Sequence, residues 1–576
     1  MNAKKLITDN LLQIVRKLMK EPVDAQVSIS EKAEQGDYYT NVAFRLASIL
    51  KKKPLDVAYE IKSELEKGTK SIKGTTGITG DFNSAIDRIE VANPGFVNFF
   101  LSEQYLRETA EYINKKGDKF GAGEKLKDQK VMVEFTDPNP FKEFHIGHLY
   151  SNVVGESLSR LYESQGATIW RVCYQGDVGL HVAKAIYGMQ KLADQMPDES
   201  APLSIRAQFM GEAYAQGSKD YESNENAKKE INELNKKIYE QDSSIRELYK
   251  KGREWSLEYF DSIYQRLGTG FKRFYFESEV GRVGAELVRE FLKKDIFEES
   301  DGAIIFPGEK YELHNRVFIN SLGLPTYEAK DLGLVPTKYK DFPYDRSIII
   351  TAQEQVEYFK VVLKALEKIN PELASKTTHI SHGIVKLPGG KMSSRTGEVI
   401  TGEWLMDEAV SRIRKDYPEM NDKISEKVGL GAIKFAFLKS VIGRDIEFNF
   451  DESISLTGES GPYLQYTYVR TKSVIEKNHE SRIMNQGKDT ESALNLEELA
   501  VLRQLVHFPQ IVENAQSKLS PNSVVSYLFE LSQRFNLFYQ KHRIAGNELR
   551  LELTRAVGHT LKNGLNLLGI ETVERM

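Results

Sequence analysis

The stretch EFTDPNPFKEFHIGH, from Glu134 to His148, decides how the middle of this chain folds. An apolar run, Val131 to Phe135, leads into it, and apolar residues at helical spacing begin after Gly147. The pattern predicts a buried strand, a tight turn and then a helix. Such an arrangement presents backbone N–H groups at a helix start, where they can bind phosphate. Two histidines at that start, His145 and His148, could add imidazole donors.

The pattern His-x-Gly-His is open to other interpretations when it stands alone. Metal binding and core packing account for two such histidines about as well as phosphate binding does. Gly147 favours a nucleotide, because a Cβ at that position would block its approach to the backbone. A second motif is therefore needed before a function can be inferred.

Bulk composition excludes several classes of protein. The 576 residues are 40% apolar and 28% charged, with a net charge of −4, which predicts an ordinary globular chain of several domains. Cys173 is the single cysteine, so a disulfide framework or a thiolate zinc site is not expected. No apolar run approaches the ~20 residues that span a membrane. The first 20 residues predict an amphipathic helix rather than a signal peptide, and we expect a cytoplasmic, monomeric protein.

Apolar spacing divides the chain into three parts. Residues 1–115 predict a small α/β domain, and residues 416–576 predict a helical bundle. Between them, strands alternate with helices from Lys130 onward, which predicts a parallel, doubly wound sheet with ligands at the carboxyl ends of its strands. A charged helical insertion is expected at about 190–290. Four later segments are expected to continue the α/β pattern, namely 303–306, 317–320, 347–351 and 383–387.

The second motif is GGKMSSRTGE, from Gly389 to Glu398. Lys391, Ser393 and Arg395 stand in a glycine-flanked, hydroxyl-rich loop, which suits a mobile clamp on a pyrophosphate leaving group. By itself such a loop is better explained as a solvated turn. Together with the histidine motif it resembles the paired signatures of class I aminoacyl-tRNA synthetases.

Nearly the whole chain resembles one family of that class, the arginyl-tRNA synthetases. The resemblance is carried by Gln35–Tyr38, Pro94–Asn98, Pro325–Asp331, Tyr463–Tyr466 and the final segment from Leu549. It implies a Rossmann-type catalytic domain at 125–415, a tRNA-contacting α/β domain at 1–115 and an all-α anticodon-binding bundle at 416–576.

The resemblance also implies the reaction, which is the attachment of L-arginine to tRNA(Arg) through arginyl-adenylate. ATP with Mg²⁺ is the expected substrate complex, with no protein-bound metal or prosthetic group, and activation is expected to need bound tRNA. One alternative is a non-catalytic tRNA-binding paralogue, which predicts erosion of the phosphate contacts. Another is a different class I synthetase or a smaller nucleotidyltransferase.

Site residues follow from the motifs that match. The expected catalytic residues are Lys142, His145, His148 and Lys391. The expected ATP-binding residues are His145, Gly147, His148, Lys391, Ser393 and Arg395. The expected arginine-binding residues are Glu134, Asn139, Tyr327, Asp331 and Gln355. The expected tRNA-binding residues are Asn98, Tyr463, Tyr466, Arg470 and Met576.

Two of these groups also make physical sense. Asp331 lies four residues after Tyr327, so on a helix the two share a face, and a carboxylate is the natural bidentate partner of a guanidinium. Tyr463, Tyr466 and Arg470 share a helix face too, which suits stacking on unpaired bases. The alternatives are an ordinary helix charge and a core tyrosine stripe.

The chain departs from the family pattern at several positions. Ser394 stands where many class I enzymes carry a second lysine, and Lys142 resembles a lysine that substitutes for it. Asp137 replaces a small hydroxyl residue, Val178 a tryptophan and Tyr358 a frequent histidine. These departures put the neighbouring contacts in doubt.

Overall fold

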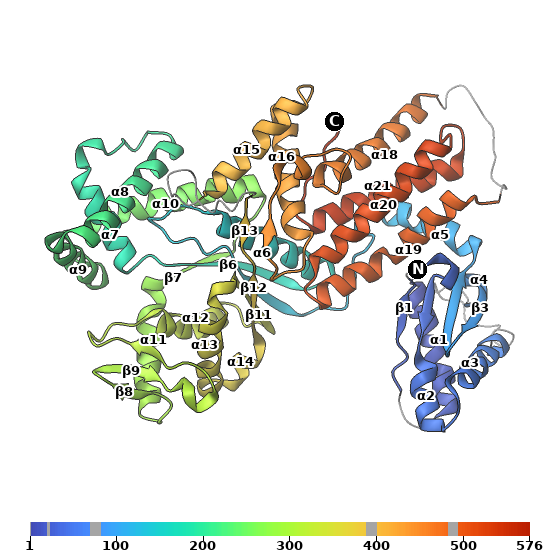
Figure 1. Cartoon of the computed structure of the whole chain (residues 1–576), viewed down its shortest axis with the longest axis horizontal. Helices are drawn as coiled ribbons and strands as arrows, with labels where there is room; N and C mark the ends of the chain where they lie inside the picture. The colour runs from blue at the N-terminus through green and yellow to red at the C-terminus, as the bar shows by residue number, and fades with distance from the viewer. Residues whose placement is uncertain (1, 20–22, 31, 69–81, 388–399, 482–492) are drawn as a thin grey trace.

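The computed structural model describes residues 2–19, 23–30, 32–68, 82–387, 400–481 and 493–576. Figure 1 shows an N-terminal part in blue, a central part from cyan to yellow and a helical part in orange and red. Within the described ranges, no helix is both long and apolar enough to cross a membrane.

The N-terminal part is the predicted small α/β domain. Four antiparallel strands pair in the order β1-β2-β4-β3, and helices pack on this sheet. The strands are β1 Val27–Ile29, β2 Tyr38–Thr40, β3 Ile86–Ala92 and β4 Phe96–Leu101. The helices are α1 Ala3–Leu18, η1 Ala33–Gln35, α2 Val42–Leu50, α3 Pro54–Gly68, α4 Phe82–Ala85, α5 Glu103–Lys116 and η2 Gly117–Lys119.

Five parallel strands form the central sheet, in the order β12-β11-β5-β6-β7. They are β5 Lys130–Glu134, β6 Thr168–Gln175, β7 Arg273–Phe276, β11 Arg346–Ala352 and β12 Thr377–His382. The strand order reverses between β5 and β11, which in doubly wound sheets is where a ligand crevice opens at the carboxyl ends. The predicted fold class is thereby confirmed.

Helices cover both faces of this sheet because β5 is apolar on both sides. Val131 and Val133 belong to the core that α6 joins, whereas Met132 packs with residues of α11 and α12. The helices are α6 Ile146–Ser164, α11 Glu277–Leu292, α12 Tyr327–Asp341, η5 Gln353–Gln355, α13 Val356–Ile369 and α14 Pro371–Lys376.

The helical insertion lies between β6 and β7 and packs as a core of its own. Its helices are α7 Leu180–Lys191, η3 Ala193–Gln195, α8 Leu203–Ser223, α9 Glu225–Glu240 and α10 Arg246–Leu267. Because β7 pairs in parallel with β6, the insertion ends before Arg273 rather than at about 290. A four-residue strand between long helices leaves little periodic signal.

Three of the four later segments that were expected to continue the α/β pattern belong to sheets other than the central one. Residues 303–306 and 317–320 form a separate antiparallel sheet from β8 Glu298–Ser300, β9 Ala303–Phe306 and β10 Arg316–Ile319, with η4 Gly308–Tyr311. Residues 383–387 hold β13 Val385–Lys386, which pairs with β14 Ile446–Glu447, and the fifth sheet strand is β12 instead. Strand type was predicted correctly, but strand partners were not.

The C-terminal part is the predicted helical bundle. Its helices are α16 Asp422–Leu438, α17 Phe450–Ser453, α18 Gly461–Ser481, α19 Leu496–Ser517, α20 Pro521–Lys541 and α21 Glu548–Leu567, and α15 Gly402–Asp416 lies before the predicted start of the bundle at 416. Their apolar faces share one core with α5 and α6. The bundle is therefore packed directly against the helix that follows the histidine motif.

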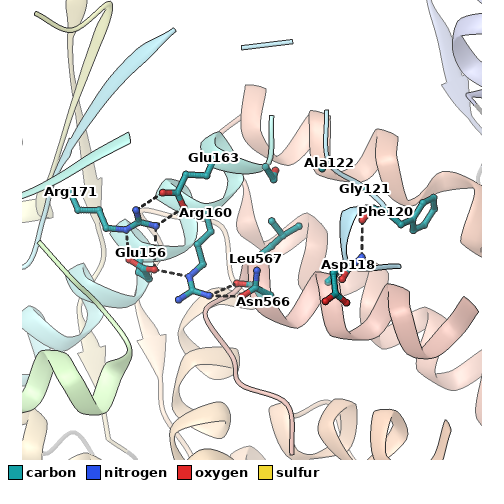
Figure 2. Close-up of a pocket in the computed structure, with 12 residues that line it drawn as sticks. Asp118, Phe120, Gly121, Ala122, Glu156, Arg160, Glu163, Arg171, Asn566 and Leu567 are labelled. Atoms are coloured by element: carbon teal, nitrogen blue, oxygen red, sulfur yellow. Dashed lines mark hydrogen bonds and ion pairs between the residues drawn. The ribbon is translucent and has the colours of Figure 1, made fainter. Parts of the chain in front are cut away.

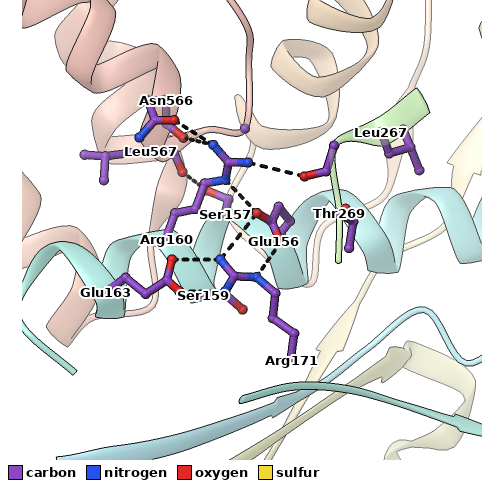
Figure 3. Close-up of polar contacts among 12 residues, drawn as sticks. Glu156, Ser157, Ser159, Arg160, Glu163, Arg171, Leu267, Thr269, Asn566 and Leu567 are labelled. Carbon is purple, nitrogen blue, oxygen red and sulfur yellow. Dashed lines mark hydrogen bonds and ion pairs between the residues drawn. The ribbon is translucent and has the colours of Figure 1, made fainter. Parts of the chain in front are cut away.

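A charged network fixes the C-terminal half of α6 (Figures 2 and 3). The buried Glu156 carboxylate accepts hydrogen bonds from Arg160 Nε at 2.6 Å and Arg171 Nε at 2.7 Å. Arg171 also forms a bidentate pair with Glu163, at 2.7 and 2.8 Å. Arg160 Nη1 donates to the Asn566 backbone and side-chain oxygens on α21, at 3.1 and 2.7 Å. We call these four charged residues the α6 network.

Two further contacts join the same helix region to the end of the bundle. Ser157 Oγ donates to the Leu567 carbonyl at 2.9 Å. The buried Lys434 Nζ donates to the carbonyls of Leu267 and Gly569, at 2.8 and 2.6 Å. Burial lowers the pKa of Lys434 to about 8. The far end of α6 is thus held by α21, and Lys434 of α16 joins the end of α10 to the chain just after α21.

Candidate active site

The turn between β5 and α6 has an unusual backbone. Thr136, Asp137 and Phe141 have φ of 80°, 46° and 68°, a region that non-glycine residues occupy at a cost of roughly 1–3 kcal/mol each. Hydrogen bonds hold it in place: Ser151 Oγ accepts from the Thr136 N–H at 2.9 Å, and Asp137 Oδ1 accepts from the Tyr174 N–H at 2.7 Å. Strain of this kind concentrates at functional sites.

His145 and His148 cap the start of α6. The His145 Nδ1 atom accepts from the Gly147 N–H at 3.1 Å, and the His148 Nδ1 atom accepts from the His145 N–H at 3.2 Å. The two rings stack, with centroids 3.6 Å apart. Because both Nδ1 atoms are acceptors, the hydrogen-bond network assigns the ring protons to Nε2. A Cβ at Gly147 would lie 3.0 Å from the His145 ring, so this glycine leaves room for the histidine itself.

Both imidazoles are neutral at physiological pH. Burial and, to a smaller extent, the Lys142 charge lower the pKa of His145 to about 4. Burial lowers the pKa of His148 well below its usual value, and His145 and Lys142 act in the same direction. The histidines can therefore donate through Nε2–H without carrying charge.

Lys142 stands three residues before His145, and its charge is among the causes that lower the pKa of both histidines. Its ammonium is 5.5 Å from the centroid of the Tyr214 ring, on α8 of the insertion. Its backbone N–H donates to the Asn139 carbonyl at 3.2 Å, which closes the turn before the histidines. Sequence and structure thus place one lysine on the same turn as both histidines.

The segment that follows the second motif returns to the histidines. The Ile146 N–H donates to the Ile400 carbonyl at 3.0 Å, and the Gly402 N–H donates to the Phe144 carbonyl at 2.7 Å. Lys391, Ser393 and Arg395 lie outside the described residues, as does Ser394. The chain just after these residues, from Ile400 onward, lies at the start of α6.

Beside the histidines, a cavity of about 600 Å³ opens at the carboxyl ends of the sheet strands. We call it the acidic pocket, because six carboxylates line it: Glu134, Asp137, Glu277, Glu328, Asp331 and Glu354. All five expected arginine-binding residues line it too, from β5, its following turn, α12 and η5. The sequence therefore grouped correctly residues that are more than 200 positions apart.

Three of these carboxylates already have a protein cation. Glu134 accepts from Lys338 Nζ at 2.6 Å, and both side chains are buried. The remaining pairs are Glu277 with Lys330 at 2.6 Å and Glu328 with Arg316 at 3.1 Å. Glu134 was expected to hold an ammonium group, and in this structure a lysine ammonium already occupies one of its oxygens.

Close packing of α11 on α12 makes the Glu277–Lys330 pair possible. A Cβ at Gly284 would lie 1.8 Å from the Ala329 carbonyl oxygen, and one at Gly333 would lie 2.5 Å from the Gly284 nitrogen. The two helices can approach this closely only with glycine at both positions. The pair is buried, and the neighbouring carboxylate raises the pKa of Lys330 against the effect of burial.

Asp331 differs from these carboxylates, because its partner is neutral. Tyr358 donates its hydroxyl to Asp331 Oδ2 at 2.5 Å, and the described residues supply no cation within ion-pair distance. Burial raises the pKa of Asp331 to about 8; the Tyr358 hydrogen bond opposes this shift, and Glu134 and Glu277 add to it. Such a carboxyl is poised to accept a cationic ligand.

The other expected pocket residues lie around the same cavity. Tyr327, at the first turn of α12, is 55% exposed and forms part of the rim. Gln355 is exposed and immediately precedes α13. Asn139 Oδ1 accepts from the Gly176 N–H at 2.8 Å. Asp137 faces the same cavity, and burial and Glu134 raise its pKa well above the usual value.

The residues expected to bind tRNA lie away from the acidic pocket. Arg470 stacks on Tyr466 at 4.8 Å, and Asn536 links Arg470 to the Tyr463 hydroxyl on the surface of α18. Asn98 is buried in β4, and Met576 packs partly buried against the bundle core. The predicted helix face exists, whereas buried Asn98 is poorly placed for direct contact.

Sequence reasoning missed the cations that pair with the pocket carboxylates and also missed Glu277. Glu277 directly follows β7, a strand that the sequence interpretation absorbed into the helical insertion. Lys338 is 204 residues from Glu134, so no local pattern links them. Val178, one of the departures, packs in the core of the insertion.

Three family models match consecutive parts of the chain. Their descriptions are "Arginyl tRNA synthetase N terminal domain" for residues 1–101, "tRNA synthetases class I (R), catalytic domain" for 112–450 and "DALR anticodon binding domain" for 464–576. Together they cover most of the three parts that the structure separates.

Similar proteins agree with these models over the full length. The arginine–tRNA ligases of Clostridium perfringens and Borreliella afzelii are 30% and 31% identical to this chain, and each alignment covers 100% of both sequences. The solved arginyl-tRNA synthetase of Thermus thermophilus has the same fold, with a TM-score of 0.78, 23% identity and 100% coverage of both chains.

Proposed function

The chain belongs to the arginyl-tRNA synthetase family of class I, and we propose that its acidic pocket binds L-arginine beside the ATP site at the start of α6. The protein is an arginine–tRNA ligase, which charges tRNA(Arg) with arginine using ATP. The assignment of roles to individual residues is the proposal.

The assignment of the pocket to arginine rests on one observation. Asp331 has no cationic partner among the described residues. Three protein cations face Glu134, Glu277 and Glu328, but Asp331 meets only a phenol. A guanidinium is planar and offers paired donors, so it suits this carboxylate. Tyr327 at the rim and Gln355 before α13 would enclose the side chain, while Asn139 and Asp137 lie toward the histidines and would receive the α-ammonium group.

Activation needs positioning and charge stabilisation more than acid–base chemistry. The arginine carboxylate attacks the ATP α-phosphorus in line, forms a C(=O)–O–P bond and expels pyrophosphate. The Nε2–H groups of His145 and His148 donate to phosphate oxygens, and Lys142 adds positive charge. Gly147 belongs to the same helix start. Mg²⁺ enters with ATP as part of the substrate, and Lys391, Ser393 and Arg395 remain predicted phosphate contacts.

In the second step the 2′-hydroxyl of the terminal tRNA adenosine, as is usual in class I, takes the arginyl group from the adenylate. We assign residues 1–115 and 416–576 to tRNA contact, with the half-buried Tyr463, Tyr466 and Arg470 as the stacking face and Asn98 and Met576 as weaker candidates. The catalytic part is assigned to 125–415. A monomer in the cytoplasm is the expected working form.

The test is ATP–pyrophosphate exchange with purified full-length protein, with and without tRNA(Arg). We expect arginine-dependent exchange only when tRNA is present, and no exchange with a panel of other amino acids. Full exchange without tRNA would contradict the coupling to tRNA. Absence of exchange under every condition would favour the non-catalytic paralogue, which the full-length similarity to arginine–tRNA ligases does not favour.

A further inference from the structure

Tyr358 occupies a distinctive place in the acidic pocket. Among the residues that the structure describes, its hydroxyl alone donates a hydrogen bond to the Asp331 carboxylate, at 2.5 Å from Oδ2. The residue itself is buried, 9% exposed, and belongs to α13 on the opposite side of the sheet's switch point from β5. The contact therefore ties Asp331 on α12 to a second element.

The Tyr358 ring is fixed on several sides. It packs with Ile349, Phe359 and Val362 in a small apolar cluster. The Arg316 guanidinium lies 5.3 Å from its ring centroid, and Glu328 holds that guanidinium at 3.1 Å. A ring held in this way gives its hydroxyl a defined position, so the donor cannot follow a carboxylate that rotates.

A fixed donor matters because an aspartate carboxylate otherwise turns easily. Its terminal torsion joins sp³ and sp² carbons, so its preferences are broad. One hydrogen bond to Oδ2 sets the carboxylate plane and leaves Oδ1, and a second lone pair of Oδ2, for a ligand. A planar guanidinium fork gains from a preset plane, whereas an ammonium group is a point charge and gains little.

We propose that Tyr358 is a positioning residue that orients Asp331 and thereby makes the pocket select guanidinium over primary ammonium ligands. The inference rests on the proposed arginine role of this pocket and specifies how its selectivity arises. Tyr358 does not touch the substrate through its hydroxyl; it acts through Asp331. Arg316 and Glu328 support the ring as a neutral pair, so they add no net repulsion toward a cationic ligand.

The test compares wild-type protein with Tyr358→Phe in arginine-dependent exchange with tRNA(Arg) present. We expect the KM for arginine to rise about tenfold, with kcat and the KM for ATP within about twofold of wild type. Tyr527→Phe is the matched control, because it removes a buried tyrosine hydroxyl that donates to the Gln504 carbonyl at 2.8 Å outside the acidic pocket, and it should leave the KM for arginine unchanged.

Inhibition by two amines separates orientation from a general loss of packing. Agmatine carries a guanidinium and cadaverine carries a primary ammonium at the same end. In Tyr358→Phe the inhibition constant of agmatine should rise about tenfold more than that of cadaverine, because loss of the hydroxyl raises the pKa of Asp331 for both amines whereas the loss of orientation affects the guanidinium. Equal weakening of both, or an unchanged KM for arginine in a folded variant, would overturn the proposal.

Two further outcomes keep the proposals distinct. If Tyr358→Phe does not fold, wild-type protein decides: agmatine must inhibit at least tenfold more strongly than cadaverine, and near-equal inhibition refutes the orientation of Asp331. If wild-type protein shows no arginine-dependent exchange at all, the proposed function of the pocket fails instead.

Discussion

Two clusters of charged side chains lie toward opposite ends of α6, and their charges are matched differently. In the α6 network two carboxylates, Glu156 and Glu163, meet two guanidiniums, Arg160 and Arg171. In the acidic pocket the five carboxylates other than exposed Glu354 face three protein cations.

The difference separates a structural cluster from a ligand site. The α6 network is complete within the chain, so it needs nothing from outside. The acidic pocket leaves Asp331 and Asp137 without a cation among the described residues, and free arginine brings two positive groups, its guanidinium and its α-ammonium. This deficit of positive charge in the acidic pocket supports the proposal that its ligand is cationic.

Removing the unmatched carboxylate should produce the largest effect. In Asp331→Ala we expect the KM for arginine to rise about 100- to 1,000-fold, roughly 3–4 kcal/mol, because a buried charge pair with the guanidinium is lost. The KM for ATP should stay within about twofold. Exchange kinetics with tRNA(Arg) measure both constants, and equal increases in the two would refute the guanidinium assignment.

A substitution in the α6 network should change the stability of the protein rather than its binding of arginine. Glu156→Gln leaves Arg160 and Arg171 without their shared anion, and we expect the free energy of unfolding to fall by roughly 2–3 kcal/mol. The KM for arginine should not change. Urea unfolding followed by circular dichroism measures the shift.

Glu163→Gln is the control for that variant. Its side chain is 43% exposed, so solvent screens its pair with Arg171 and the loss should be under ~1 kcal/mol. A change in the KM for arginine in either variant would contradict the distinction between a complete cluster and a ligand site.

The smallest expected effect is on pH dependence. With the pKa of Asp331 raised to about 8, the empty pocket holds a protonated carboxyl at neutral pH, and binding of a guanidinium must release that proton. The KM for arginine should therefore fall about tenfold between pH 6 and pH 7. His145, with its pKa near 4, does not titrate in this range.

The groups around Asp331 fix the sign of that dependence. Burial and the neighbouring Glu134, Glu277 and Glu328 raise its pKa, and the Tyr358 hydroxyl alone among the named groups lowers it. Asp331→Asn has no proton to release at this position, so its KM should depend less steeply on pH, and Asp137 is then the remaining carboxyl near the ligand with a raised pKa. A flat profile for the wild-type protein would show that Asp331 is already ionised in the empty pocket.

Much of the site could be predicted because its signals are local. The strand–turn–helix at Glu134–His148 and the i, i+4 pair Tyr327 and Asp331 each lie within one or two elements, where periodicity and turn chemistry apply. Gln355 was likewise expected before a helix and is found there.

The remainder depends on contacts between distant segments. Lys338 reaches Glu134 only because α12 packs under β5, and the four-residue strand β7 has too little length to show a period beside α10 and α11. The antiparallel pairing of β9 with β10 likewise depends on partners rather than on composition. Sequence patterns specify single helices and strands well. They specify poorly which charges and which strands pair when the partners lie far apart in the sequence.

Helix α6 is held at both ends and connects the histidines rigidly to the bundle. Its 19 residues span about 28 Å, at 1.5 Å per residue. Ile400 pairs with its first turn, and Asn566 and Leu567 hold its last turns. A rotation of about 5° about the bundle end would carry the histidine end through roughly 2.4 Å, nearly the length of a hydrogen bond. A tilt of that size would change the reach of the histidine Nε2–H groups toward a phosphate bound at the start of α6.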